Sequence, residues 1–259
     1  MAVDLDDLLA PDAPDWFRRA LAAPHTDHEV EVGGTPIHYV AWGRRGRRGL
    51  VFVHGGGAHA HWWTHVAAPY AADYRVVAVD LSGHGDSGRR ERYSLEQWAA
   101  EVLAVAADAG VDGPPVAGGH SMGGFVGVVL AHRHPDLVTS LVLVDGGLPL
   151  TPPAGVTSDQ LAAATLGPAA ARLEQTFASP EAYRATWRAH PAFAREWSDL
   201  VEAYADYDLV GDEPELRAAT RVEALQGDIR ELVDGDDVLR ALEHLPTPTP
   251  WLLAPRGLM

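Results

Sequence analysis

Residues 116–126 read VAGGHSMGGFV, an apolar run that ends in the pattern Gly119-x-Ser121-x-Gly123. Small and apolar residues with helical spacing follow at once, so the pattern predicts a strand, a sharp turn and a helix. Glycines two positions before and after the serine let strand and helix approach each other without a Cβ between them. This arrangement is typical of a nucleophile elbow with Ser121 at its tip. The alternative is a glycine-rich turn with an incidental serine.

The same turn predicts a site that holds negative charge. The amide of Met122 would lie at the start of a helix, where unpaired N–H groups and the helix dipole favour an anion. A second donor is expected from residues 54–57, HGGG, which follow the apolar run 50–53. Glycines at a strand end leave backbone amides uncovered, so we favour Gly56 as this oxyanion donor and Gly57 next. A plain flexible loop is the alternative.

The composition excludes several classes of protein. A net charge of −16 over 259 residues argues against nucleic acid and anionic membrane surfaces as partners. The partner that we expect, from the motifs rather than from the charge, is a small-molecule substrate. The chain has no cysteine, and all 20 of its basic residues are arginine, which excludes thiolate chemistry, a P-loop lysine and a lysine Schiff base. We expect no cofactor. Residues 1–7 are acidic and no long apolar run follows, so a cytoplasmic location is expected.

Apolar strand patterns alternate with helical patterns along the first part of the chain. This order predicts an α/β protein with a mostly parallel, doubly wound sheet. The expected strands are a hairpin over 28–42 and buried runs at 50–53, 75–80, 116–119 and 139–145, with helices at 94–109 and 122–134. A short helix at 15–21 is expected to pack Trp16 and Phe17 on the body of the protein.

The sequence pattern changes after residue 146, where prolines and glycines form a linker. We predict a core with an N-terminal hairpin over 1–147, a helical cap over 148–246 and a return to the core over 247–259. The cap region shows only helical periodicity. Its aromatic residues are interpreted first as cap core and second as the lining of an apolar pocket.

Polar residues follow the predicted strands at their carboxyl ends. His54, Asp80, Ser121 and Asp145 each stand at such an end, and parallel strands bring these ends to one edge of the sheet. We interpret Asp80 as a residue that ties down loop amides rather than as a catalytic group.

Several neighbouring rings are candidates for contact with a ligand. Trp62 and His120 are candidate substrate-binding residues. His59, His61 and His65 are interpreted as surface or pocket-rim histidines, and a metal site is the less favoured alternative because no carboxylate stands at ligand spacing.

These motifs in this order resemble the α/β-hydrolase superfamily, in particular its serine-nucleophile branch with a helical cap. The resemblance is strong over residues 28–147 and weak over 250–257. It implies acyl transfer without a cofactor: Ser121 attacks a carbonyl, a histidine removes its proton, an acid orients that histidine, and the amides of Met122 and Gly56 stabilise the oxyanion.

The family's order of serine, acid and histidine is not completed in this sequence. The histidines after Ser121 are His132, His134, His190 and His244. The first two lie too far along the elbow helix to reach the serine, and the others precede the last predicted strand. The ending 251–259 resembles the family's penultimate strand, interrupted before its acid. We expect the acid loop, the last strand, the base histidine and the closing helix to be missing.

Asp145 is therefore a candidate acid, although a structural role is favoured for it. The leading hypothesis is a serine hydrolase of a small ester-like substrate, with little turnover by these 259 residues alone. A carbon–carbon bond hydrolase or cofactor-free perhydrolase is the second hypothesis, and a non-catalytic ligand-binding member of the fold is the third. Serine at the elbow disfavours haloalkane dehalogenase and epoxide hydrolase chemistry, which needs aspartate there.

Overall fold

The computed structural model describes residues 14–149, 152–190, 193–194, 197–227, 236–245 and 248–254. The acidic residues 1–7 and the ending 255–259, on which two of the expectations above depend, lie outside these ranges. The elements are α2 (Asp15–Leu21), β1 (Thr26–Val32), β2 (Thr35–Trp42), β3 (Arg48–Val53), η1 (Ala60–Trp63), α3 (Thr64–Ala67), η2 (Ala68–Tyr70), β4 (Arg75–Val79), α4 (Leu95–Asp108), β5 (Asp112–His120), α5 (Met122–Arg133), η3 (Pro135–Leu137), β6 (Ser140–Val144), α6 (Ser158–Leu173), α7 (Pro180–Ala189), α8 (Asp199–Tyr207), β7 (Leu209–Val210), β8 (Arg217–Ala218), α9 (Val222–Gly227), α11 (Asp236–Leu242) and β9 (Trp251–Leu252).

The central sheet is mostly parallel, as predicted. Its strand order is β1-β2-β4-β3-β5-β6-β9. β3 pairs in parallel with both β4 and β5, and β6 pairs in parallel with β5 and β9. The hairpin of β1 and β2 adds two antiparallel strands at one side. The register places Val53 opposite Gly119 and His120 opposite Val144, so the predicted carboxyl ends meet at one edge.

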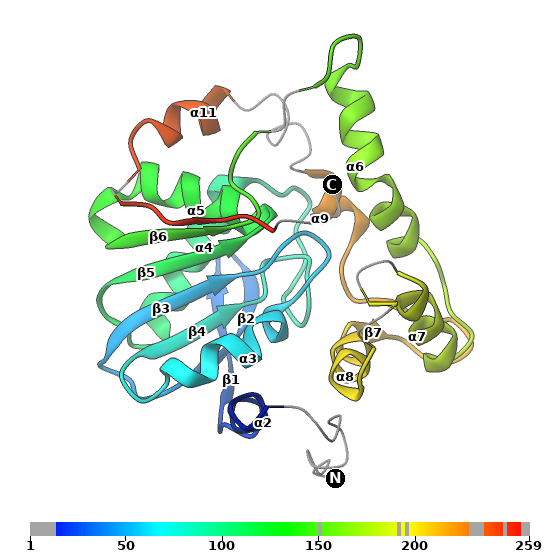
Figure 1. Cartoon of the computed structure of the whole chain (residues 1–259), viewed down its shortest axis with the longest axis horizontal. Coiled ribbons are helices and arrows are strands. Elements are labelled where there is room, and N and C mark those ends of the chain that lie inside the picture. The colour runs from blue at the N-terminus through cyan, green and yellow to red at the C-terminus, as the bar shows by residue number, and fades with distance from the viewer. Residues whose placement is uncertain are drawn as a thin grey trace.

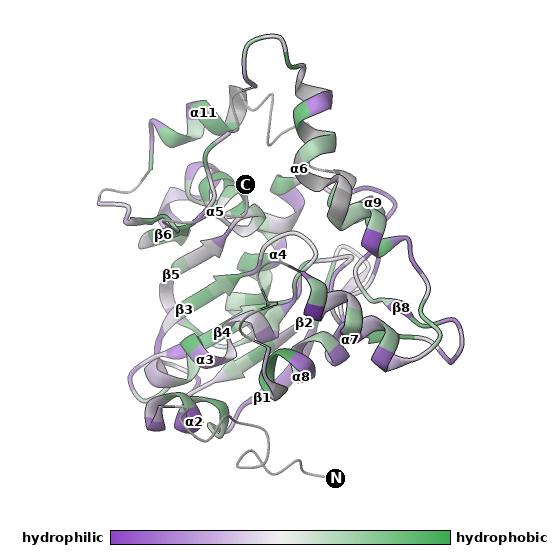
Figure 2. Cartoon of the chain, turned by 45° about the vertical axis from the view of Figure 1, so that its right-hand side comes forward, coloured by the Kyte–Doolittle hydropathy of each residue, from purple (hydrophilic) through white to green (hydrophobic). Residues whose placement is uncertain are grey.

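Alternate residues of the strands feed two hydrophobic clusters, one on each face of the sheet. Val51 and Val53 of β3 join the cluster that contains α4 and α5, whereas Leu50 and Phe52 pack in the cluster on the opposite face with η1 and α3. This is the doubly wound arrangement that apolar runs without polar alternation predict. Figure 1 shows the layers, and Figure 2 shows that the central strands are largely apolar.

Local signals in the sequence place the helix ends correctly. The side chain of Ser94 accepts a hydrogen bond from the Gln97 amide at the start of α4, and α5 ends at Arg133, just before Pro135. The prediction for α2 is wrong in part. Trp16 is 53% exposed, and the buried residues of this helix are Ala20 and Leu21.

The region predicted as a helical cap departs from the prediction in two ways. β7 and β8 form a short antiparallel ribbon, which the helical periodicity of the sequence did not indicate. Helix α11 packs against α5, and its Val238 and Ala241 belong to the main core, so the range 148–246 includes a core element. In Figure 1, α6, α7 and α8 stand beside the carboxyl ends of the strands, whereas α11 lies next to α5. None of the helices in the described ranges combines the length and apolar character needed to cross a bilayer.

Candidate active site

Ser121 stands on a strained turn between β5 and α5. Its backbone has φ 50° and ψ −119°, a conformation that residues other than glycine rarely adopt. Its amide donates to the carbonyl of Val144 at 3.0 Å, and its carbonyl accepts from the amide of Gly124 at 2.9 Å. Such strain persists only where the surrounding structure holds the turn in place. Strand, turn and helix thus have the geometry that the sequence predicts for an elbow.

Three glycines make this turn sterically feasible. A Cβ on Gly119 would lie 2.1 Å from the carbonyl oxygen of Gly123, and a Cβ on Gly123 would lie 2.4 Å from the carbonyl oxygen of Val53. Gly146, at the end of the next strand, leaves room for Ser121 itself, because its Cβ would lie 2.3 Å from the Ser121 carbonyl oxygen. The spacing in the sequence indicates the first two glycines, whereas only the fold identifies the third.

The glycine loop after β3 lies against the elbow. A Cβ on Gly55 would be 3.1 Å from the Cβ of Ser121, and a Cβ on Gly56 would be 3.9 Å from the Cβ of Met122. Gly57 faces elsewhere, toward Arg172. Of the two glycines weighed as an oxyanion donor, Gly56 is the one that lies against Met122.

Two cavities meet at this edge of the sheet. The smaller, of about 390 Å³, is lined by Ser121, the glycine loop and residues of α6 and α7. The larger, of about 710 Å³, extends toward α2 and the end of β9. Both are lined by Trp62, His120, Phe193 and Tyr204, so these four rings form the wall between them. The cap aromatics thus divide: Phe193 and Tyr204 line the cavities, while Phe177 and Tyr183 are buried in the cap's own hydrophobic cluster.

The two candidate substrate-binding rings stack on each other. The centroids of Trp62 and His120 are 5.3 Å apart with nearly parallel planes. Burial lowers the pKa of His120, and the nearby carboxylate of Asp145 opposes that effect. Nδ1 of His120 has no hydrogen-bond partner within the described part of the chain. His120 is therefore a neutral ring at neutral pH, positioned beside Ser121 as part of the cavity wall.

Asp145 follows β6 with φ 46° and lines the larger cavity, not the one that contains Ser121. Its Oδ1 accepts the amide of Ala254 at 3.4 Å. Asp145 directly precedes Gly146, the glycine that leaves room for Ser121. Its role as a catalytic acid stays a prediction.

The histidines after Ser121 occupy two different places. His132 and His244 lie together at the far end of α5, with ring centroids 5.7 Å apart. His190 instead lines the cavity of Ser121, and burial together with the charge of Arg172 lowers its pKa. The sequence located His190 in the cap but contained no signal that it faces the elbow.

Asp80 ties down loops, as its position predicts. It is fully buried and accepts hydrogen bonds from the amides of Ala60 at 2.6 Å and Asp86 at 3.1 Å. Burial alone would raise the pKa of Asp80, but the hydrogen bond from His38, 2.8 Å long, and the charges of His59, His54 and His38 together outweigh it and hold that pKa well below its usual range. Tyr207 of the cap also donates to Asp80, at 3.3 Å, so this carboxylate joins the cap to the core.

The interpretation of the three histidines near Trp62 is confirmed for two of them. His61 and His65 line the larger cavity, but His59 is fully buried, with Nε2 3.0 Å from the carbonyl oxygen of Tyr204. The prediction of a rim position for His59 is therefore wrong, because α8 of the cap covers it. Among the described residues, no three His, Asp or Glu side chains converge to hold a metal ion.

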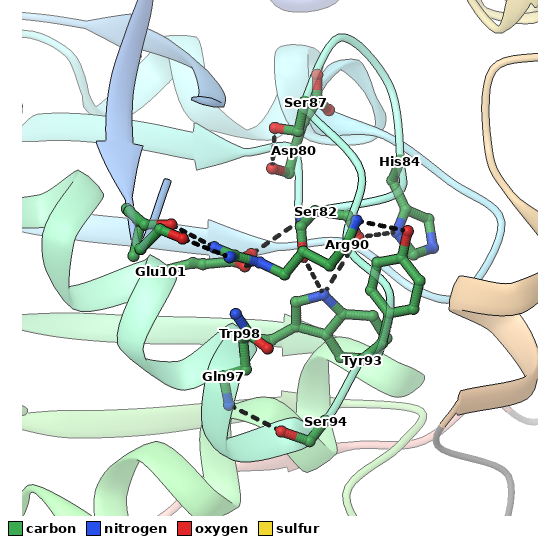
Figure 3. A network of polar contacts seen from close by, with 12 residues as sticks. Asp80, Ser82, His84, Ser87, Arg90, Tyr93, Ser94, Gln97, Trp98 and Glu101 are labelled. Atoms are coloured by element: carbon green, nitrogen blue, oxygen red, sulfur yellow. Dashed lines mark hydrogen bonds and ion pairs between the residues drawn. The ribbon is translucent and has the colours of Figure 1, made fainter. Parts of the chain in front are cut away.

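A buried ion pair supports the loop between β4 and α4. Arg90 Nε donates to Glu101 Oε1 at 2.9 Å, and the Ser82 amide donates to Glu101 Oε2 at 2.9 Å. Trp98 Nε1 donates to the hydroxyl of Ser82 at 3.1 Å. Figure 3 shows that these contacts connect α4 with the loop that carries Asp80 and His84. The network holds in place the loop after β4, which β3 separates from the elbow strand β5.

The buried imidazole of His84 predicts a loss of stability in acid. Burial, reinforced by the His54 ring, lowers the pKa of His84 from 6.5 to about 3. Below pH 6.5 the unfolded chain therefore binds a proton that the folded chain excludes, so the free energy of unfolding falls as the pH drops. At pH 5 this group alone should cost about 2 kcal/mol relative to pH 7.5. Urea unfolding at pH 5 and pH 7.5 measures this effect. We expect His84→Asn to reduce the difference in the free energy of unfolding between the two pH values by about 2 kcal/mol. An unchanged difference between the two pH values would contradict this.

Comparisons with known proteins agree with this geometry. The model of the alpha/beta hydrolase fold family matches residues 50–196, more than half of the chain. Esterase Rv0045c of Mycobacterium tuberculosis is 41% identical over 120 residues, which are 45% of this chain and 39% of that protein. Epoxide hydrolase 4 of Mus musculus is 29% identical over 124 residues, 47% of this chain and 34% of that protein. The chain thus matches little more than a third of the length of these relatives.

The solved structure of a thioesterase domain from the curacin biosynthetic pathway superposes with a TM-score of 0.70. It is 25% identical, and the match covers 88% of this chain and 82% of that one. Sheet order, elbow, family model and structural neighbour all agree. The chain belongs to the α/β-hydrolase fold family.

Proposed function

We propose that this protein is a serine hydrolase that cleaves a small, ester-like carbonyl substrate through an acyl-enzyme on Ser121. The observation that carries the proposal is the backbone of Ser121, strained at φ 50° at the start of α5 and open to a cavity beside a triple-glycine loop. A turn of this kind holds the hydroxyl out of the helix and toward a bound carbonyl. A glycine-rich turn with an incidental serine would have no reason to keep this strain.

Charge that develops in the reaction would be stabilised by two amides. Met122 is the first residue of α5, so its amide has no partner within the helix and lies at the positive end of the helix dipole. Gly56 lies against Met122 from the neighbouring loop. Two amides from different loops that point to one position are the usual donor set for a tetrahedral intermediate.

Acylation also needs a group that accepts the proton of the Ser121 hydroxyl. No side chain among the described residues forms a hydrogen bond with the Ser121 hydroxyl. Of the histidines that follow Ser121 in the sequence, His190 is the one that lines the same cavity. A serine without its base keeps only the rate enhancement from oxyanion stabilisation and binding, on the order of 10³ to 10⁴ over water. We therefore expect slow acylation and little turnover from this chain.

The relatives support hydrolysis more than any one substrate. The 41% identical relative is named an esterase, and ester cleavage is the chemistry that a serine elbow performs. The relative named epoxide hydrolase is less informative, because that chemistry needs aspartate where this chain has Ser121. Carbon–carbon bond hydrolysis and perhydrolysis use the same constellation and would leave the acylation test unchanged.

A fluorophosphonate probe tests the proposal without knowledge of the substrate. We expect an adduct on Ser121, formed over hours at pH 8.5 and located by peptide mass spectrometry. Ser121→Ala should abolish the adduct. Ser198→Ala should keep it, because Ser198 lines only the larger cavity, where its side chain caps α8. A folded protein that forms no adduct at Ser121 would refute the hydrolase and favour a non-catalytic ligand-binding protein.

A further inference from the structure

A single arginine from the cap enters the cavity of Ser121. Arg172, near the end of α6, lines this cavity, and its side chain is only 13% exposed. Its Nη2 lies 3.4 Å from the position that a Cβ on Gly57 would occupy, so the guanidinium faces the glycine loop. Among the described residues that line this cavity, Arg172 carries the one permanent positive charge. A fixed cation placed here in a chain with net charge −16 calls for an explanation.

Contacts behind the cavity position this guanidinium without covering its loop-facing side. Nη1 donates to the hydroxyl of Tyr183 at 3.2 Å and lies 3.6 Å from Oδ2 of Asp208. The guanidinium carbon stands 4.4 Å above the ring of Trp187. Asp208 is a buried counterion, with a side chain 2% exposed, that reaches Arg172 from the inner side through Nη1. The contacts orient the planar group and leave Nη2 toward Gly57.

The charge of Arg172 acts within the cavity as well as behind it. It lowers the pKa of His190, whose ring lines the same cavity, in addition to the effect of burial. None of the described residues that line this cavity is an aspartate or glutamate, and the counterion Asp208 lies behind Arg172. An anionic group of a ligand would be attracted to this side, and the planar fork of arginine suits the two oxygens of a carboxylate.

We propose that Arg172 binds a carboxylate of the substrate, so that the protein acts on esters of acids that carry a second carboxyl group. This inference rests on the proposed function and specifies its substrate class. Gly57, which Arg172 faces, is two residues from Gly55, which abuts Ser121, and two residues span at most about 7 Å. The guanidinium and Ser121 thus line the same cavity, at a separation that one short dicarboxylic acid chain can span. The apolar cavity beyond Trp62 receives the uncharged part of the substrate.

Binding to an inactive variant tests this assignment separately from catalysis. In the Ser121→Ala background, titration calorimetry compares the monomethyl esters of straight-chain C4 to C8 dicarboxylic acids with the corresponding dimethyl esters. We expect at least one chain length to bind about tenfold or more tightly as the monoester, the effect of one charged hydrogen bond. Arg172→Gln should reduce this ratio to about one.

Two further variants keep the test decisive. Arg188→Gln is the matched control, because Arg188 also stands above a cap tryptophan, 4.9 Å from the Trp197 ring, but does not line the cavity. It should retain the preference for the monoester. Should Arg172→Gln fail to fold with Asp208 unpaired, the double replacement Arg172→Gln with Asp208→Asn removes both charges and should also lose the preference.

Equal affinities of monoesters and diesters at every chain length would overturn the assignment, as would a preference that survives the loss of Arg172. The outcome is distinguishable from failure of the proposed function. A protein that prefers the monoester but forms no adduct at Ser121 has the carboxylate site without the hydrolase, whereas one that forms the adduct without the preference has the hydrolase without the site.

Discussion

Alanine at position 119 is expected to destabilise the protein by about 3 kcal/mol or more, the upper range for overpacking of a closely packed interior. The added methyl group would lie 2.1 Å from the carbonyl oxygen of Gly123, 2.4 Å from its carbonyl carbon and 2.7 Å from the amide nitrogen of Gly124. All three are backbone atoms of the first turn of α5, so no side-chain rotation relieves the clash. The helix would have to move away from β5, and the elbow would open.

Urea unfolding of the purified variant measures this effect, and Gly167→Ala is the matched control. Gly167 lies within α6, and a Cβ there would meet no atom within 4 Å. Alanine at this position should therefore change the free energy of unfolding by no more than about 1 kcal/mol, because helix propensity favours it while the following Pro168 disfavours a side chain in a helical residue before it. A Gly119→Ala variant that loses less than about 1 kcal/mol would show that the crossing of β5 and α5 is looser than described.

Removal of the buried carboxylate at position 101 is expected to cost about 3 to 5 kcal/mol. Arg90 and Glu101 have side chains 9% and 0% exposed, so Glu101→Ala leaves a guanidinium without a counterion in the protein interior. The amide of Ser82 loses its acceptor in the same step. Burial raises the pKa of Glu101 even though the Ser82 amide and Arg90 oppose it. The intact pair therefore stabilises the fold less than its disruption costs.

The control for this prediction lies on the same helix. Glu96 pairs with Arg133, but the two side chains are 62% and 53% exposed. Glu96→Ala should change the free energy of unfolding by less than about 1 kcal/mol, because solvent screens an exposed pair. Similar losses for both variants in urea unfolding would contradict the distinction between the buried and the exposed pair.

Most of the core was predictable from the sequence because its signals are local. The N-cap at Ser94, the stop at Pro135 and the glycines around Ser121 each act on residues within a few positions, and the apolar runs of a parallel sheet need no knowledge of their partners. Helix α11 was assigned to the cap although it packs on the core. Its seven residues, with Val238 and Ala241 buried, are compatible with packing on the cap or on the core.

The sequence by itself thus determined the doubly wound sheet, the elbow and the residue at its tip. Tertiary structure alone decided which cap residues face that residue. Arg172 is oriented by Asp208, 36 positions later in the chain. Asp80 accepts a hydrogen bond from the hydroxyl of Tyr207, 127 positions away. Contacts at such separations leave no periodic trace in the sequence, because each depends on how whole helices pack rather than on neighbouring residues. For this reason Ser121 at the tip of the elbow was visible in the sequence, whereas the guanidinium in its cavity was not.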